Sequence, residues 1–420
     1  MTYSIPQVQI QSDFLQVLKD NYDEETIWIR INDESFNIKI ENSSLIYNLK
    51  DDIKIIKKNL KNDNNNIIYE INKFGIEKII LKFPIKYHNL IIKNNEFNQP
   101  NIICLSSIKN DKIMFGTSDG NIIKVNNNPL PLKINNYIFK KEAHFTYISK
   151  LISFKSGIML LSCGLDMKIK IWKNDKFNSN FDLNPVRILD GKHKNRITDI
   201  CTIGKGRNII SCGLDAKLII WELGSGKSIW IGNRIKNLND GYTSLCISKG
   251  GINGIDEDPF FECFGKIVWC GHKSGYISIW DLGTRLSLGE FQCNNENFSD
   301  ENFSVENLDC IDGENIIVGL NNGDIIKFNY NKDLKLSKEL WRTNIEKMEF
   351  LNSFINIKKI KIYLNSIIVL SDNYLVRLSF ETGELENIFV GYDDTINSFS
   401  INDDILIATG KRGLILSFKL

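Results

Sequence analysis

The sequence predicts an all-β fold, a seven-bladed β-propeller with a small N-terminal domain. Three observations lead to this prediction. The 420-residue chain repeats one pattern seven times, in which a small residue and a polar turn precede a strand that ends in an apolar or aromatic residue. The repeats are spaced by about 40 to 60 residues, which is room for four short strands each. The chain also stops directly after the third strand of its last repeat.

The repeats differ in how closely they follow the pattern. Four copies match it well, at residues 116–125, 164–172, 213–221 and 271–281. Three later copies are degenerate, at 319–328, 371–378 and 410–418, and end in Phe328, Leu378 and Phe418 where tryptophan is usual. Alternating or wholly apolar strands around a tight turn indicate β-structure, and the period is that of WD40 repeats.

The ring of blades has to close, because an open propeller would leave long strand edges exposed. We expect the missing outer strand of the last blade within residues 79–92, upstream of the first repeat. The propeller then occupies residues 76–420. Residues 1–75 form the small N-terminal domain, with strand-like runs at 27–31 and 36–40.

Composition excludes several classes of partner. The 52 basic and 51 acidic residues leave a formal charge of +1, which gives no overall attraction to nucleic acid or to anionic membranes. No apolar run approaches the roughly 20 residues that span a bilayer, and residues 1–6 lack the features of a signal peptide. We expect a soluble, cytoplasmic protein that is monomeric on its own, with the nucleus left open as a second location.

Two sets of polar residues recur with the blade period. Each set contains the residue types of a Ser-His-Asp catalytic site, but such a site would also need an exposed nucleophile and an oxyanion hole. We interpret both sets as buried hydrogen-bonded chains, because buried polar groups need partners. No catalytic residue is therefore predicted. The sets are His144, Ser162, Asp166 and Trp172 in one blade, and His193, Ser211, Asp215 and Trp221 in the next.

No cofactor or metal site is predicted either. The four histidines are scattered, without cysteines or acidic residues at ligand spacing. Residues 224–228 resemble the end of a phosphate-binding P-loop, but Trp221 stands where that motif requires its first glycine. The nine cysteines lie mostly singly in apolar runs, as small buried hydrophobic residues do.

Loops on the two faces of the disk are the expected binding sites. The loops that enter the first strand of each blade should share one face with the turns between second and third strands. We expect this face to bind a basic protein surface, with solvated loop charge as the alternative for any single residue. An insertion at 250–265 should lie on the opposite face, as a second docking element or folded onto its own blade. The candidate partner-binding residues are Glu142, Asp190, Asp240, Tyr242, Tyr392, Asp393 and Asp394.

With the repeats placed, the chain resembles the WD-repeat chaperones that assemble the base of the 26S proteasome regulatory particle, the proteasomal ATPase-associated factors. The similarity is sharpest at residues 10–18, with the acidic run 23–25, and at 206–215. It implies a non-enzymatic chaperone that binds the C-terminal domain of one AAA ATPase subunit of the base and consumes no ATP itself. It also implies that Asp393 and Asp394, in the loop entering the last blade, contact that domain.

Two other classes of function remain as alternatives. A general WD40 adaptor, such as a substrate receptor of a ubiquitin ligase, would have the same fold and a different partner. An enzyme on a propeller would need acid, base or metal-binding residues that converge in the central channel. The sequence indicates no such convergence.

Overall fold

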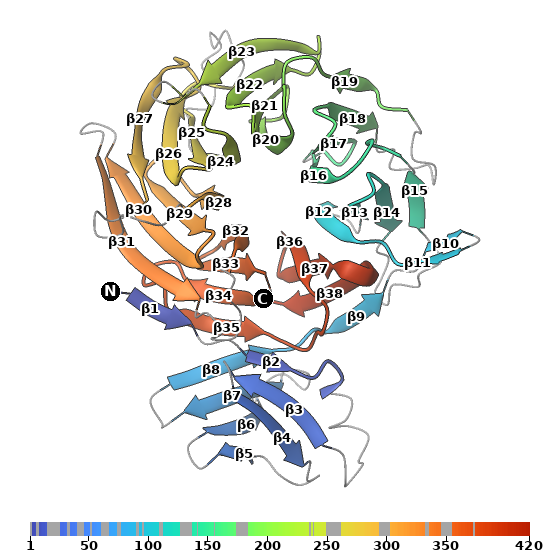
Figure 1. Cartoon of the computed structure of the whole chain (residues 1–420), viewed down its shortest axis with the longest axis vertical. Helices are drawn as coiled ribbons and strands as arrows, with labels where there is room; N and C mark the ends of the chain where they lie inside the picture. The colour runs from blue at the N-terminus through green and yellow to red at the C-terminus, as the bar shows by residue number, and fades with distance from the viewer. Residues whose placement is uncertain are drawn as a thin grey trace.

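The computed structural model of the chain is a ring of β-sheets with the N-terminal strands attached at one side (Figure 1). Within the ranges given below, no helix is long and apolar enough to cross a membrane. The residues described by the structure are 2–5, 8–14, 26–31, 34–39, 46–50, 53–59, 67–73, 77–89, 92–94, 96–108, 112–126, 137–140, 142–154, 156–173, 184–234, 237, 239–248, 262–293, 303–331, 336–345, 355–372 and 374–420.

Each blade is an antiparallel sheet whose first strand lies nearest the axis of the ring (Figure 1). Blade one contains β12 (Ile102–Ile108), β13 (Lys112–Thr117), β14 (Ile122–Asn126) and β15 (Tyr137–Lys140). Blade two contains β16 (Ile148–Ser153), β17 (Met159–Gly164), β18 (Ile169–Lys173) and β19 (Arg187–Leu189). Blade three contains β20 (Ile197–Ile203), β21 (Asn208–Gly213), β22 (Lys217–Glu222) and β23 (Lys227–Asn233). Blade four contains β24 (Tyr242–Ile247), β25 (Ile267–His272), β26 (Tyr276–Asp281) and β27 (Ser287–Gln292).

The remaining blades recruit strands from the N-terminal part of the chain. Blade five contains β28 (Val305–Cys310), β29 (Asn315–Leu320), β30 (Asp324–Asn331) and β31 (Leu336–Ile345), and β1 (Thr2–Ile5) pairs parallel with β31. Blade six contains β32 (Ile357–Tyr363), β33 (Ser366–Ser371), β34 (Leu375–Ser379) and β35 (Leu385–Phe389). Blade seven contains β36 (Ile396–Asn402), β37 (Ile405–Gly410) and β38 (Leu414–Lys419), with the short 3-10 turn η1 (Lys411–Gly413) before β38. Its outer strand is β9 (Lys86–Asn89), which lies within the expected range 79–92 and pairs antiparallel with β38.

The burial of the second strand of each blade explains why the repeats contain apolar runs. In β21 every residue is buried, because the strand is covered by neighbouring blades on both faces. Seven apolar clusters are present among the described residues, and each joins two adjacent blades. A blade therefore buries its apolar faces only as part of the ring.

The repeated glycine permits a close approach between strand and loop. A Cβ atom on Gly164 would lie 2.5 Å from the carbonyl oxygen of Tyr147, and one on Gly410 would lie 2.0 Å from that of Thr395. Both distances are too short for any side chain. The glycine thus brings the end of the second strand against the loop that enters the same blade.

A bulge interrupts the pairing of the first and second strands in all seven blades described. In blade two the register shifts between Ile148 and Lys150, and in blade three between Ile197 and Asp199. A bulge inserts one extra residue and re-aims the side chains that follow it. In these two blades, the residue that resumes the pairing is charged.

The N-terminal strands form two further groups. One is a three-stranded sheet of β2 (Val8–Ile10), β3 (Thr26–Ile31) and β4 (Glu34–Lys39). The other consists of β5 (Ile46–Lys50), β6 (Ile53–Asn59), β7 (Ile67–Lys73) and β8 (Glu77–Lys82), and β8 pairs parallel with β35 of blade six. The expected domain boundary after residue 75 falls between the paired strands β7 and β8. Main-chain hydrogen bonds therefore join the N-terminal strands to the propeller. Between β9 and blade one lies a short hairpin of β10 (Ile92–Asn94) and β11 (Glu96–Asn98).

Candidate protein-interaction face

The hydrogen-bonded chain predicted in blade two is present. His144 lies with Nδ1 2.9 Å from the carboxylate of Asp166 and Nε2 2.6 Å from Oγ of Ser162. Nε1 of Trp172 donates to the same serine oxygen at 2.8 Å. The chain links the loop that enters the blade to the turn between its second and third strands, so both lie on one face, as predicted.

Blade three contains the same arrangement. His193 lies 3.1 Å from Asp215 and 2.8 Å from Ser211, and Trp221 donates to Ser211 at 2.8 Å. Burial by itself raises the pKa of Asp215, but the hydrogen bond and charge of His193 outweigh it, and the pKa lies below its ordinary value. The serines are buried and already engaged, so these groups stabilise the blades and present no exposed nucleophile.

Two predicted contact residues belong to a related buried network in blade four. Asp240 is 6 % exposed and forms an ion pair with Arg234, and it accepts a hydrogen bond of 2.5 Å from Ser274. Tyr242 is fully buried, with its ring centroid 4.5 Å from that of His272. The prediction that Asp240 and Tyr242 contact a partner is therefore wrong. Serine replaces the turn aspartate in this blade, and Asp240 supplies the carboxylate from the entering loop instead.

The other candidates lie at or near the surface. Glu142, Asp190 and Asp393 are exposed, and Asp394 is partly exposed. Asp190 pairs with Lys168 and Asp394 pairs with Arg412, each at 3.8 Å. Such long, solvated ion pairs contribute little to stability, which leaves these carboxylates able to exchange partners.

Tyr392 is a less accessible candidate. Its ring packs against the apolar cluster between blades six and seven, and burial raises the pKa of its hydroxyl. Tyr392 therefore supports the loop that carries Asp393 and Asp394.

The N-terminal segment lies beside the acidic pair, a contact that the sequence did not predict. Oγ of Ser12 donates to Asp393 at 2.5 Å, and Phe14 stacks on Phe83 with ring centroids 5.2 Å apart. Gln9 reaches Tyr374 of blade six at 3.3 Å. The only available signal was the similarity of residues 10–18 to the chaperone family, which gave no position for the segment.

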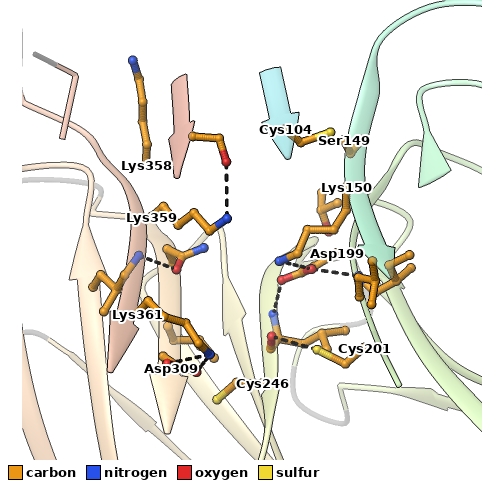
Figure 2. Close-up of a pocket in the computed structure, with 18 of the residues that line it drawn as sticks. Cys104, Ser149, Lys150, Asp199, Cys201, Cys246, Asp309, Lys358, Lys359 and Lys361 are labelled. Carbon is orange, nitrogen blue, oxygen red and sulfur yellow. Dashed lines mark hydrogen bonds and ion pairs between the residues drawn. The ribbon is translucent and has the colours of Figure 1, made fainter. Parts of the chain in front are cut away.

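The central channel contains charged groups that converge, contrary to expectation. Its cavity of about 650 Å³ is lined by the first strands of all the blades. Figure 2 shows Lys359 and Lys361 on one wall and Lys150 with Asp199 on the other. The alternation of apolar and polar residues along the first strands did not reveal which side chains point into the channel. The bulge in each first strand shifts this alternation.

Most of these charges connect neighbouring blades. Asp199 pairs with Lys150 of blade two at 2.8 Å and accepts a hydrogen bond from the amide of Leu245 in blade four at 3.2 Å. Asp309 likewise pairs with Lys361 of the next blade at 3.0 Å. Lys359 donates to the carbonyl of Phe399 at 2.7 Å, and burial lowers its pKa to about 7. The carboxylates are thus committed to holding the ring together.

Other features of the described residues are structural. They contain no cluster of three or more side chains suited to a metal ion. None of the nine cysteines is disulfide-bonded, and eight are buried, in agreement with their predicted role as small apolar residues.

Most of the insertion predicted at 250–265 lies outside the described residues. At its end, the Glu262 carboxylate accepts a hydrogen bond from the amide of Lys205 in blade three.

Comparison with known proteins agrees with this architecture. The family model described as "WD domain, G-beta repeat" matches residues 135–173 and 183–222, which contain the outer strand of blade one, all of blade two and the first three strands of blade three. The chain is similar in structure to the β-propeller domain of Cps50 (Swd1) from Myceliophteria thermophila, with a TM-score of 0.58 over 80 % of this chain and all of that domain. Sequence identity to that domain is 12 %, so the similarity concerns the fold alone.

The fold and the repeats define the chain as a β-propeller that contains WD40 repeats. Within this class it is related to the 26S proteasome regulatory subunit RPN14 of Saccharomyces cerevisiae, with 30 % identity over 291 residues. The aligned region spans 67 % of this chain and 66 % of the yeast protein, slightly less than two thirds of its length. The chain thus contains WD40 repeats and has a relative that is named as a proteasome regulatory subunit.

Proposed function

We propose that the chain is a non-enzymatic chaperone of the proteasome regulatory particle that binds the C-terminal domain of one AAA ATPase subunit of the base. The proposal rests on one observation, the 30 % sequence identity to the 26S proteasome regulatory subunit RPN14 over 291 residues. Buried polar side chains of the propeller form hydrogen bonds and ion pairs within and between the blades. Such a fold is suited to binding a partner rather than to catalysis.

The acidic pair in the loop entering blade seven is the proposed contact. Asp393 is exposed, and Asp394 forms a 3.8 Å pair with exposed Arg412. Both carboxylates can therefore pair with lysines or arginines of the ATPase domain. Occupation of that domain would block its premature docking on the proteolytic core.

Charge reversal tests this contact. The double variant Asp393→Lys/Asp394→Lys should bind the purified ATPase C-terminal domain at least about tenfold more weakly, because each attraction becomes a repulsion. The matched control is Asp403→Lys/Asp404→Lys, which changes the same charge on exposed residues of the opposite face of blade seven. Binding is measured by calorimetry against each base ATPase domain in turn.

A second control separates docking from the N-terminal contact. Ser12→Ala removes the hydrogen bond to Asp393 without changing charge. The proposed contact is wrong if the reversed variant binds as well as the wild type. It is also wrong if Ser12→Ala weakens binding as much as charge reversal does.

A further inference from the structure

A cluster of exposed apolar side chains lies in blade two, on the face of the propeller that carries Asp393 and Asp394. Phe145 is 90 % exposed, and Leu165 and Met167 are 42 % and 40 % exposed. Phe145 belongs to the loop entering the blade, and the other two belong to the turn between its second and third strands. An exposed aromatic residue beside two exposed aliphatic ones is typical of the centre of a protein interface.

The hydrogen-bonded chain of blade two holds this cluster outward. His144 is fully buried and bonded to Asp166, so the side chain that follows it in the loop, Phe145, faces solvent. Asp166 is likewise turned toward His144, and its neighbours Leu165 and Met167 lie outside. The cluster is therefore pre-organised, which reduces the entropic cost of binding.

The fold itself does not require Phe145 and Met167, whereas Leu165 has an equivalent leucine, Leu214, in blade three. Blade three has the same hydrogen-bonded chain with the same sequence separation of 22 between histidine and aspartate. There, the position equivalent to Phe145 is Lys194, which is exposed, and the position equivalent to Met167 is Ala216. Phe145 and Met167 thus expose apolar surface where the next blade exposes charge or little side chain.

A series of linked loops and turns connects the apolar cluster to the proposed acidic contact. Neighbouring loops and turns on this face are joined, one to the next, from blade seven through blade one to blade two. The links are the Asp394–Arg412 pair at 3.8 Å, Gly413 N to Pro100 O at 2.7 Å, Ser118 N to Asn101 O at 3.0 Å, and His144 N to Gly120 O at 2.9 Å.

Charge around the cluster defines what can bind it. Exposed Asp119, Glu142 and Asp190 surround it on blades one to three, and Lys168 pairs with one of them. Beyond Asp190 the sign reverses at the exposed residues Lys192, Lys194 and Arg196, which mark the end of the acidic surface.

We propose that Phe145, Leu165 and Met167 form the apolar anchor of a docking surface that runs to Asp393 and takes a protein segment with an apolar side chain flanked by lysine or arginine. The partner's identity rests on the proposed function, whereas the chemistry of the segment rests on this face alone. An apolar anchor with an acidic rim fits that segment and rejects acidic ones.

Site-specific photo-crosslinking tests the proposal. A benzoylphenylalanine is placed at position 145 of the full chain and, as the control, at position 364. Leu364 is 77 % exposed in the turn between β32 and β33, on the opposite face. Both proteins are irradiated in a cell extract, and the crosslinked peptides are identified by mass spectrometry.

The expected result is an adduct specific to position 145 whose crosslinked peptide carries an apolar residue beside lysine or arginine. No adduct beyond that of position 364 would overturn the inference, and so would a peptide without basic residues. A basic, apolar peptide from a base ATPase subunit supports the proposed function as well. Such a peptide from another protein supports this surface and counts against the proposed function.

A substitution adds a quantitative test. Phe145→Lys places at this position the residue that blade three carries at the equivalent one, so the variant is expected to fold normally. It should bind the crosslinked partner about tenfold or more weakly, as loss of a central aromatic anchor does. Unchanged affinity with the wild-type melting temperature would contradict the proposal.

Discussion

At the scale of single residues, one hydroxyl group organises each hydrogen-bonded chain. Oγ of Ser162 lies within hydrogen-bond distance of both His144 and Trp172, and all three side chains are almost fully buried. The sequence predicted these chains because their members lie close together along one repeat. Asp240 and Tyr242 were misplaced because sequence spacing does not show whether a residue near the end of a loop faces solvent or the neighbouring blade.

Loss of this hydroxyl should be costly. Ser162→Ala leaves two buried groups without their partner, and we expect the free energy of unfolding to fall by about 2 kcal/mol. Urea denaturation followed by circular dichroism measures the change. The control is Ser225→Ala, because Ser225 is exposed, where it donates to Glu222 at 2.6 Å and accepts from the amide of Lys227 at 3.3 Å. Equal effects of the two substitutions would contradict the structural role of Ser162.

His272 gives a prediction about pH. It is fully buried, and burial lowers its pKa from 6.5 to about 4. Between these values the unfolded chain binds a proton that the folded chain does not, so the free energy of unfolding decreases as pH falls from 7 toward 4. We expect the urea midpoint of the wild type to fall more steeply between pH 7 and pH 5 than that of His272→Gln. Identical pH dependence of the two proteins would show that His272 is not buried in its neutral form.

At the scale of elements, the repeat predicted the second and third strands better than the others. Their apolar runs and the intervening turn carry the pattern, whereas the bulge in each first strand disturbs the alternation. The joining of β1 to blade five and of β8 to blade six was not predictable. Pairing between strands distant in the sequence depends on tertiary packing, which local periodicity does not record.

Contacts between blades should contribute measurably to the stability of the ring. Asp199→Ala removes a buried partner of Lys150 and leaves the amide of Leu245 unpaired, so we expect a loss of about 3 kcal/mol. Asp190→Ala removes an exposed pair with Lys168 and should cost less than about 1 kcal/mol. Thermal melting of the two variants compares these effects. A larger shift for Asp190→Ala would contradict the role assigned to the channel carboxylates.

At the scale of the whole molecule, the propeller combines a core built from repeated blades with two faces whose loops differ from blade to blade. The hydrogen-bonded chains fix the loops of blades two and three, while the exposed residues on those loops differ from blade to blade. The sequence predicted the acidic pair of blade seven as a contact but did not single out Phe145. The sequence alone does not show that Phe145 is exposed. Its exposure follows from the burial of the preceding residue, His144, which only the structure shows.

We propose that this face of the propeller binds an ATPase subunit of the proteasome regulatory particle. The most direct test of this claim is affinity purification of the tagged full chain from a cell extract, with mass spectrometry of all retained proteins. The predicted result is recovery of base ATPase subunits without the mature proteolytic core. Recovery of a different stable complex that lacks ATPase subunits would contradict the claim and leave a WD-repeat scaffold for another partner.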